Sequence, residues 1–218
     1  MGVGSPDVSR ETSPSAPPPA AAAVCGDALA GMAAYAELLA GPGVAHGLIG
    51  PREVPRLWER HLLNCAVVVP TVPTGSSVID VGSGAGLPGL VWALLRPDLA
   101  IVLVEPLLRR AEFLAVAVQE LALTEVRVVR ARAEDLAGRY AADIVTARAV
   151  APLPRLLSWT LPLVRPGGRL MAFKGRSASA ELAAASDTLR TAATSAVLTT
   201  YGEGVLDPPA TVVEVSAP

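Results

Sequence analysis

The sequence predicts an α/β fold with a mostly parallel, doubly wound sheet that ends in an antiparallel hairpin and follows a small helical segment. Three observations support this expectation. From residue 75 onward, short β-rich runs alternate with helical patterns, which is typical of right-handed βαβ units. The last two β-rich runs, SAVLTTY and TVVEV, are joined by a Gly/Pro-rich loop with no room for a helix. Half of the residues are hydrophobic (51%), enough for one sizeable core.

The part of the chain before the sheet is expected to have two regions. Residues 1–24 are rich in Ser, Pro and Ala, and we expect a disordered tail because such a segment buries little apolar surface. Residues 25–74 should form a helical segment. Asp27 is placed to cap its first helix, which should stop at Gly41–Pro42. The second helix should run from about Pro55 to Val68.

The second of these helices has two distinct faces. Its expected inner stripe consists of Trp58, His61, Leu62 and Cys65. Histidine and cysteine in such a stripe are typical of packed core positions, so we expect His61 to be a hydrogen-bonded core residue and Cys65 not to be a nucleophile. Arg56 and Arg60 lie four residues apart on another face.

Residues 75–218 should form the sheet domain. The parallel strands are predicted at the runs SSVIDVG, LAIVLVEP, VRVVRA, ADIVTARA and GRLMAFKG. Helical stretches near residues 88–96, 107–122, 152–164 and 178–194 separate them or precede the hairpin. In open α/β sheets the ligand binds beyond the carboxyl ends of the strands, near the point where strand order reverses. The segment after the first strand is therefore a candidate binding loop.

That segment, DVGSGAGLPG, fits two registers. From Gly84 it spells the G-x-G-x-x-G of a dinucleotide site, which must offer backbone N–H groups to a pyrophosphate. In this register Pro88 removes one donor and Asp80 places a carboxylate near the anion. From Gly82 it spells G-S-G-A-G behind an acid, which suits a cofactor with a sulfonium and an ammonium and no phosphate. The second register predicts S-adenosylmethionine, with NAD as the alternative.

Residues around this loop agree with the second register. Pro88 would lie in the first turn of the following helix, where a missing N–H costs nothing, and Gly89 would be a close-packing residue. Glu105, at the end of the second strand, suits the two ribose hydroxyls of either cofactor. After the third strand two interpretations stay open: Ala133–Glu134 flank an adenine, or Glu134 and Asp135 cap the next helix.

Composition limits the partners of the protein. A net charge of −2 gives no overall attraction to nucleic acid, so any such contact needs a local patch. Two cysteines without C-x-x-C spacing predict a reduced, cytoplasmic protein with no metal site. No apolar run approaches the roughly 20 residues of a membrane span, so we expect no membrane contact. Lys174 is the one lysine beside 17 arginines.

Seven segments occur together in a characteristic order: GLIGPRE, LWERHLLNC, DVGSGAGLPG, LVEPLLRRAEFL, ARAE, VTARAVAPL and RPGGRLMAFKG. Together they resemble the glucose-inhibited division protein B family, the small-subunit ribosomal RNA guanine-N7 methyltransferases. The resemblance runs from about residue 27 to the C-terminus. D-x-G-x-G-x-G alone is generic, whereas HLLNC, GLPG, VTARA and FKG as a set are specific. The resemblance implies a Rossmann-like class I methyltransferase that transfers a methyl group from S-adenosylmethionine to N7 of guanine 527 in 16S rRNA.

The resemblance also implies roles for individual residues. Gly82, Ser83, Gly84 and Leu87 would hold the methionine portion behind Asp80, Glu105 the ribose, and Ala133 and Glu134 the adenine. Arg148 would lie at the junction of cofactor and substrate. The residues that would meet RNA are Arg52, Arg56, Arg60 and Lys174. Independently of the resemblance, Arg176 would complete a local cationic patch with these arginines from across the cleft. Asn64–Cys65 depart from the family pattern, since many relatives carry Asp-Ser there. The partner would be 16S rRNA or the 30S subunit, with no DNA, and the protein a monomer.

The chemistry of guanine N7 sets what the side chains must do. N7 has a free lone pair and no proton, so attack on the sulfonium methyl needs positioning and no general base. Arg148 and Lys174 both follow apolar strands at the ligand edge, and we hypothesise that they bind phosphates or guanine O6. The alternative is that these cations, like the other arginines, are simply solvated. Other function classes that remain are an NAD-dependent oxidoreductase, a methyltransferase for another RNA or a small molecule, and a non-enzymatic adaptor.

Overall fold

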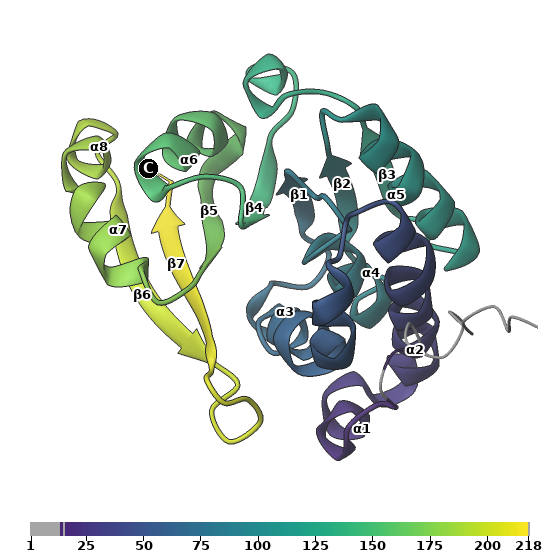
Figure 1. Ribbon diagram of the computed structural model, residues 1–218. Helices are drawn as coiled ribbons and strands as arrows, with labels where there is room; N and C mark the ends of the chain where they lie inside the picture. Colours follow the sequence, from purple (N-terminus) through teal and green to yellow (C-terminus); the bar gives the residue numbers. More distant parts are fainter. Residues whose placement is uncertain (1–13, 15, 218) are drawn as a thin grey trace, which may run out of the picture.

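A seven-stranded sheet forms the centre of the protein. The computed structural model describes residue 14 and residues 16–217, so most of the predicted tail lies outside the described residues. The strand order is β3-β2-β1-β4-β5-β7-β6 (Figure 1). The strands are β1 Ser77–Val81, β2 Ala100–Val104, β3 Val126–Val129, β4 Ala142–Arg148, β5 Val164–Lys174, β6 Ser195–Tyr201 and β7 Ala210–Ser216. The first five strands run parallel, and β7 is antiparallel to β5 and β6. The predicted fold class, including the C-terminal hairpin, is confirmed.

Helices cover both faces of this sheet, because side chains that alternate along each strand point to opposite faces. Val78 and Ile144 belong to one buried cluster and Ile79 and Val145 to another. The first cluster is covered by α4 Gly89–Leu95, α5 Leu108–Glu120 and the helices before the sheet. The second is covered by η7 Ala133–Leu136, α6 Leu153–Thr160, η8 Leu161–Leu163, α7 Ala178–Ala184 and α8 Ser186–Thr191. Strand order reverses between β1 and β4, so the predicted site lies at their carboxyl ends.

The helical layer, residues 19–72, differs from the prediction at its start. Helix α1 spans Pro19–Cys25, so the expected disordered tail is wrong for residues 19–24. Ala is the strongest helix former and Pro is favoured in a first turn, so this Pro/Ala run is helical despite its composition. Ala21 and Cys25 are buried against the rest of the layer. Asp27 is not an N-cap, because α1 continues through η2 Gly26–Ala28 into α2 Leu29–Leu38.

This first helix also does not end at Gly41–Pro42. It passes Pro42 in the π-helical turn η3 Leu39–Gly43, where wider hydrogen bonding accommodates a residue without an N–H. The whole helix, Pro19–Gly43, is long and apolar enough by length and composition to cross a membrane, so the expectation that no run approaches a span was wrong. Core helices of soluble proteins and N-terminal signal sequences pass the same test, so it carries little weight alone. Met32, Tyr35 and Leu39 are completely buried here, while 28% of the apolar window as a whole is buried.

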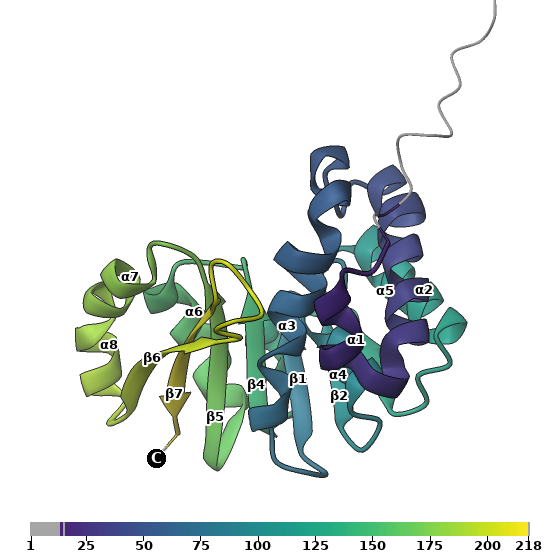
Figure 2. The same ribbon diagram turned by 90° about the horizontal axis from the view of Figure 1, so that it is seen from below.

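The second part of the helical layer agrees with the predicted helix near residues 55–68. It consists of η4 Pro51–Arg56, the π-helical η5 Leu57–Leu63, α3 Asn64–Ala66 and η6 Val69–Thr71. Trp58, Leu62 and Cys65 are buried, as the stripe predicts. In Figure 2 the helical layer lies beside the sheet, with α3 next to α4. The indole of Trp92 in α4 donates to the Cys65 carbonyl oxygen (3.0 Å), which helps to fix this layer on the sheet domain.

Gly89 lies where α4 packs closely against the sheet. A Cβ at this position would lie 2.3 Å from Leu103 Cδ2 and 2.7 Å from Asp80 Oδ2, which confirms the close-packing prediction. We expect Gly89→Ala to lower the free energy of unfolding by about 1–3 kcal/mol, as overpacking does. Gly41→Ala is the matched control, because a Cβ there meets nothing within 4 Å and Ala favours the helix. Urea unfolding of both variants measures the difference, and equal stabilities would contradict the packing argument.

Candidate functional site

The glycine loop, residues 82–88, leaves β1 in a conformation that only glycine adopts easily. Gly82 and Gly86 have φ angles of 65° and 96°, in the left-handed region. Both are also packed from the side where a Cβ would lie. A Cβ on Gly82 would be 2.7 Å from Val150 Cγ2, and one on Gly86 would be 2.3 Å from Leu90 Cδ1. The loop is therefore fixed between α4 and the segment that follows β4.

The N–H groups of this loop are mostly used within the protein. Gly82 and Ser83 donate to the Val104 carbonyl oxygen. Gly86 and Leu87 donate to the Ser83 carbonyl oxygen, and Gly84 donates to Glu105. A pyrophosphate site needs several N–H groups directed at the ligand. Since these five donors are already occupied, the dinucleotide register has no support from the geometry.

Glu105 ties β2 to the glycine loop. Its Oε2 accepts from the Gly84 N–H and its Oε1 from the Leu107 N–H, both at 3.0 Å. The side chain is only 2% exposed. Each carboxylate oxygen keeps further acceptor capacity after one bond. Glu105 thus lies where the sequence predicts a ribose ligand, directly beside the loop.

Asp80 lies beneath the loop and is completely buried. Its Oδ2 accepts from the Gly89 N–H at 3.1 Å, and Oδ1 has no hydrogen-bond partner among the described residues. Burial raises the pKa of Asp80 to about 7, and the bond from Gly89 only partly opposes this shift. The buried carboxylate lies beneath the loop and supports it through Gly89, and its predicted part in cofactor binding stays a prediction.

Tyr35 is a site residue that the sequence did not reveal. It is completely buried in α2, and its hydroxyl donates to the Ala85 carbonyl oxygen at 2.7 Å. Burial raises the pKa of this phenol well above its ordinary value, so it stays a donor. The partner is 50 residues away in the chain. No local pattern around Tyr35 could indicate this contact between the helical layer and the glycine loop.

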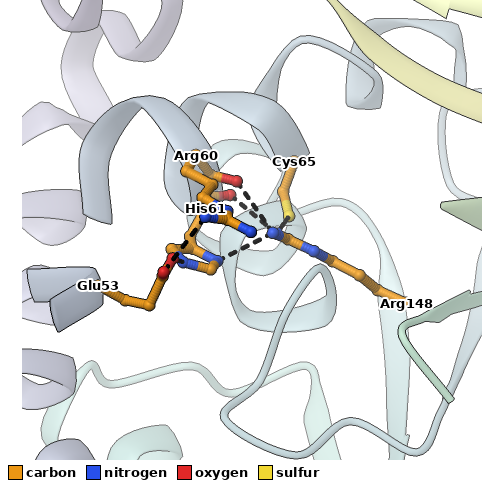
Figure 3. A network of polar contacts seen from close by, with 5 residues as sticks. All are labelled: Glu53, Arg60, His61, Cys65 and Arg148. Carbon is orange, nitrogen blue, oxygen red and sulfur yellow. Dashed lines mark hydrogen bonds and ion pairs between the residues drawn. The ribbon is translucent and has the colours of Figure 1, made fainter. Parts of the chain in front are cut away.

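Arg148 clamps the end of β4 to the helical layer (Figure 3). Its Nη2 donates to the Arg60 carbonyl oxygen and to His61 Nδ1, both at 2.9 Å. Its Nη1 contacts the His61 carbonyl oxygen at 3.3 Å and Cys65 Sγ at 3.1 Å. The guanidinium therefore points into the helical layer, although the sequence placed it at a strand end facing ligands. We call this set of contacts the Arg148 clamp.

His61 completes the Arg148 clamp as a neutral imidazole. Burial and, second, the charge of Arg148 lower its pKa to about 4, and the contact with Glu53 only partly opposes this shift. Because a guanidinium can only donate, Nδ1 accepts from Arg148 and Nε2 carries the proton. Nε2 then donates to Glu53 Oε2 at 2.9 Å. His61 is the hydrogen-bonded, packed histidine that its stripe position predicted.

Lys174 is not a free cation. Its Nζ donates to the Ala151 carbonyl oxygen at 2.8 Å and to Glu181 Oε2 at 2.7 Å. The side chain is only 8% exposed. The prediction that Lys174 presents its charge to RNA is therefore corrected for this conformation, because the ammonium is neutralised inside the protein.

A groove of about 1240 Å³ lies between the helical layer, the ends of β4 and β5, and the loop that joins β6 to β7. Val150 is part of its wall and also packs against Gly82, so the groove borders the glycine loop. Its basic lining residues are Arg56, Arg60, Arg148, Lys174 and Arg176, and its acidic ones are Glu59, Glu181 and Asp207. The structure thus brings most of the predicted RNA-facing residues together, but Arg52 is not in the lining.

The predicted adenine-flanking residues lie at the start of η7 Ala133–Leu136. Ala133 is buried and Glu134 is exposed. The N-cap of η7 is Arg132, with no side-chain cap hydrogen bond, so the capping interpretation of Glu134 and Asp135 is wrong. Among residues 14 and 16–217, no group of His, Cys, Asp and Glu could hold a metal ion.

Comparisons with known proteins extend these observations. Residues 28–203 match the family model described as GidB, rRNA small subunit methyltransferase G. The chain is 57% identical over 201 residues to a ribosomal RNA small subunit methyltransferase G of Thermobifida fusca, which covers 92% of this chain and 85% of that protein. A protein of the same description from Kineococcus radiotolerans is 60% identical over 187 residues, 85% of this chain and 74% of that one.

Solved structures share the fold at low sequence identity. A Corynebacterium glutamicum protein superimposes with a TM-score of 0.57 at 18% identity, over 86% of this chain and 89% of that chain. A ribosomal protein L11 methylase from Lactobacillus delbrueckii subsp. bulgaricus gives a TM-score of 0.54 at 12% identity, over 71% and 75%. At these identities the likeness concerns the fold alone.

The raised pKa of Asp80 predicts a pH-dependent stability. The pKa is 3.8 ordinarily and about 7 in the folded protein, so the folded state binds this proton more readily than the unfolded state. Proton binding by Asp80 therefore adds to the free energy of unfolding below about pH 4, and this addition is lost as the pH rises towards 7. Between about pH 5 and pH 8, the wild type should lose on the order of 2 kcal/mol relative to Asp80→Asn.

Urea unfolding of both proteins at the two pH values measures this difference. His61 acts in the opposite direction, because its pKa falls from 6.5 to about 4 on folding. That contribution is lost as the pH falls below 6.5, and it cancels in the comparison because both proteins contain His61. A stability difference that stays constant with pH would contradict the assignment of Asp80.

Proposed function

Because this chain belongs to the rRNA small subunit methyltransferase G family, we propose that it methylates N7 of guanine 527 in 16S rRNA with S-adenosylmethionine as the methyl donor. Family membership makes the chain an rRNA methyltransferase. The cofactor, the nucleotide and the atom are the proposed part. Their support comes from the glycine loop and the groove beside it.

The proposal rests mainly on the backbone N–H groups of the glycine loop, which already have partners within the protein. Five loop N–H groups are satisfied internally, and Asp80 and Glu105 place two carboxyl groups below and beside the loop. Occupied N–H groups leave few donors for a pyrophosphate, and the Glu105 carboxylate beside the loop would favour a ligand with positive charge, whereas Asp80, whose pKa is about 7, is only partly charged at neutral pH. S-Adenosylmethionine carries an ammonium and a sulfonium, and when bound it supplies the electrophilic methyl group. The residues present therefore fit this cofactor better than NAD.

Individual residues of the chain would hold the cofactor in distinct ways. Gly82, Ser83, Gly84 and Leu87 would contact the methionine portion through their backbone. Glu105 has acceptor capacity left on both oxygens for ribose hydroxyls. Ala133 and Glu134 lie at the end of β3, next to β2, where an adenine attached to that ribose would extend.

The groove supports RNA as the substrate. Its three exposed arginines, Arg56, Arg60 and Arg176, supply a local cationic surface in a protein whose net charge is −2, although Arg60 also pairs with Glu53 at 3.2 Å. Arginine binds phosphate oxygens in a bidentate manner, and phosphate contacts position a nucleic acid without reading its sequence. The groove meets the glycine loop at Val150, so a nucleotide extruded from the RNA would reach the methyl donor there.

Methyl transfer to N7 requires alignment rather than proton transfer. When bound, S-adenosylmethionine would supply the methyl group and its sulfur would keep the electron pair of the carbon–sulfur bond, so N7, which has a lone pair and no proton, would need no base from the protein. The guanine ring gains a positive charge, so a free cation against N7 would oppose the reaction. The Arg148 clamp directs the nearest guanidinium at carbonyl oxygens and His61 of the helical layer. Arg148 is thus a positioning residue rather than an acid or base.

The mapping of N7-methylguanosine in 16S rRNA tests the proposed function. Cells that lack the gene should lose this modification at position 527 and regain it on complementation. Complementation with Glu105→Gln should restore it poorly, because loss of a charged acceptor weakens cofactor binding by about tenfold or more. An identical methylation pattern with and without the gene would refute the proposed nucleotide and atom.

The salt dependence of RNA binding tests the groove. If Arg56 contacts a phosphate, Arg56→Ala should reduce the slope of log affinity against log salt by about 1. Arg127→Ala is the matched control, since Arg127 is an exposed arginine on β3, four strand positions away from β5 in the sheet. Binding of a 16S rRNA fragment over a range of salt concentrations provides the slopes. Equal slopes for wild type and Arg56→Ala would remove Arg56 from the interface.

A further inference from the structure

The ion pair of Lys174 and Glu181 joins three elements. Lys174 is the last residue of β5 and Glu181 lies in α7. Lys174 Nζ donates to the Ala151 carbonyl oxygen (2.8 Å), and Glu181 Oε2 accepts from the Leu153 N–H (2.9 Å) at the start of α6. The first bond holds the post-β4 connection, residues 149–152, and the second holds Leu153, the residue that directly follows it. Each residue of the ion pair therefore makes one hydrogen bond to the segment that follows β4.

The post-β4 connection is strained and lies over the cofactor loop. Ala149 has a φ of 56°, a left-handed conformation that costs an alanine about 1–2 kcal/mol. Such a conformation persists only where the surrounding contacts enforce it. The next residue, Val150, packs against Gly82. A Cβ on Gly82 would lie only 2.7 Å from Val150 Cγ2. Any release of this connection would move Val150 away from the glycine loop.

The charges of Lys174 and Glu181 neutralise each other within the protein. Burial acts to raise the pKa of Glu181, but hydrogen bonds from Lys174, Ser177 and Leu153 outweigh it and lower the pKa below its ordinary value. Glu181 therefore stays ionised and neutralises the ammonium, whose side chain is 8% exposed. A phosphate would have to displace a carboxylate 2.7 Å from Nζ. The groove surface available to RNA phosphates is then formed by its arginines.

We propose that Lys174 and Glu181 form a lock that positions the post-β4 connection over the glycine loop, so that both act on cofactor binding rather than on RNA phosphates. The inference rests on the proposed function for the identity of the cofactor. Removal of either partner leaves an uncompensated, largely buried charge and frees Ala151 or Leu153. Ala149 can then leave its left-handed conformation, and Val150 no longer forms a wall of the cofactor site.

Four variants of the full chain test the lock. Lys174→Met and Glu181→Gln each remove one charge at nearly constant volume, and the double variant removes both. Ser177→Ala is the control, because it removes only the exposed hydrogen bond to Glu181 Oε1 (2.8 Å). S-Adenosylmethionine affinity is measured by calorimetry, and RNA binding by its salt slope. Hydrogen exchange of the peptide that contains residues 149–153 reports the connection directly, and circular dichroism establishes that each variant is folded.

The lock predicts a specific pattern. Each single variant should bind S-adenosylmethionine about tenfold more weakly, as loss of a group that orients a ligand-contacting segment typically does. The double variant should be no weaker than either single variant, since the partners act as one unit. Hydrogen exchange in residues 149–153 should rise in both single variants and in the double variant. Ser177→Ala should keep the wild-type exchange and cofactor affinity, and all variants should keep the wild-type RNA salt slope.

Two outcomes would overturn the lock. Unchanged cofactor affinity with a salt slope reduced by about 1 in Lys174→Met alone would make Lys174 a phosphate contact. Unchanged exchange of residues 149–153 in folded Glu181→Gln would show that the pair does not hold the connection. If the wild type itself fails to bind S-adenosylmethionine, the proposed cofactor is wrong, and the exchange experiment still decides whether the lock exists.

Discussion

The site depends on a guanidinium that, together with the Trp92 indole, joins the helical layer to the sheet. Arg148, at the end of β4, makes four contacts of 2.9–3.3 Å with residues 60–65 of the helical layer. Hydrogen bonds from a charged donor contribute more than neutral ones, and loss of the donor would leave carbonyl oxygens without a partner. With this layer in place, Tyr35 reaches the Ala85 carbonyl oxygen and fixes the glycine loop from the other side. The loop and one wall of the groove therefore depend on the Arg148 clamp.

Charges of opposite sign are separated around this clamp. Asp80 and Glu105 are buried at the ends of β1 and β2, where they surround the glycine loop with acceptors. The arginines lie on the groove side, beyond Val150. The two cations nearest the strand ends, Arg148 and Lys174, are both occupied by protein groups. In the proposed reaction, which creates positive charge on a base, the base would thus be kept apart from free cations, while RNA phosphates would meet the arginines farther out.

Local sequence patterns predicted the sheet well and the helical layer less well. The strands and the hairpin follow from short β-rich apolar runs that end in polar or Gly residues, and that signal is local. The run at residues 19–24 failed because composition alone suggested disorder, whereas burial of Ala21 against later residues makes the helix stable. Gly41–Pro42 failed for a similar reason, since a π-helical turn packed in the core carries the helix past the proline.

The sequence by itself determined which residues meet at the carboxyl edge of the sheet, because parallel strands must end on the same side. Asp80, Glu105, Arg148 and Lys174 were all identified from that rule, and Asp80 and Pro88 already favoured a cationic cofactor over a dinucleotide. Only the tertiary structure decided what each charge contacts. Asp80 is turned beneath the loop, Arg148 into the helical layer and Lys174 towards Glu181. The physical reason is that a charge near a buried surface must find a counter-charge or hydrogen bonds, and those partners come from segments 7 to 88 residues away.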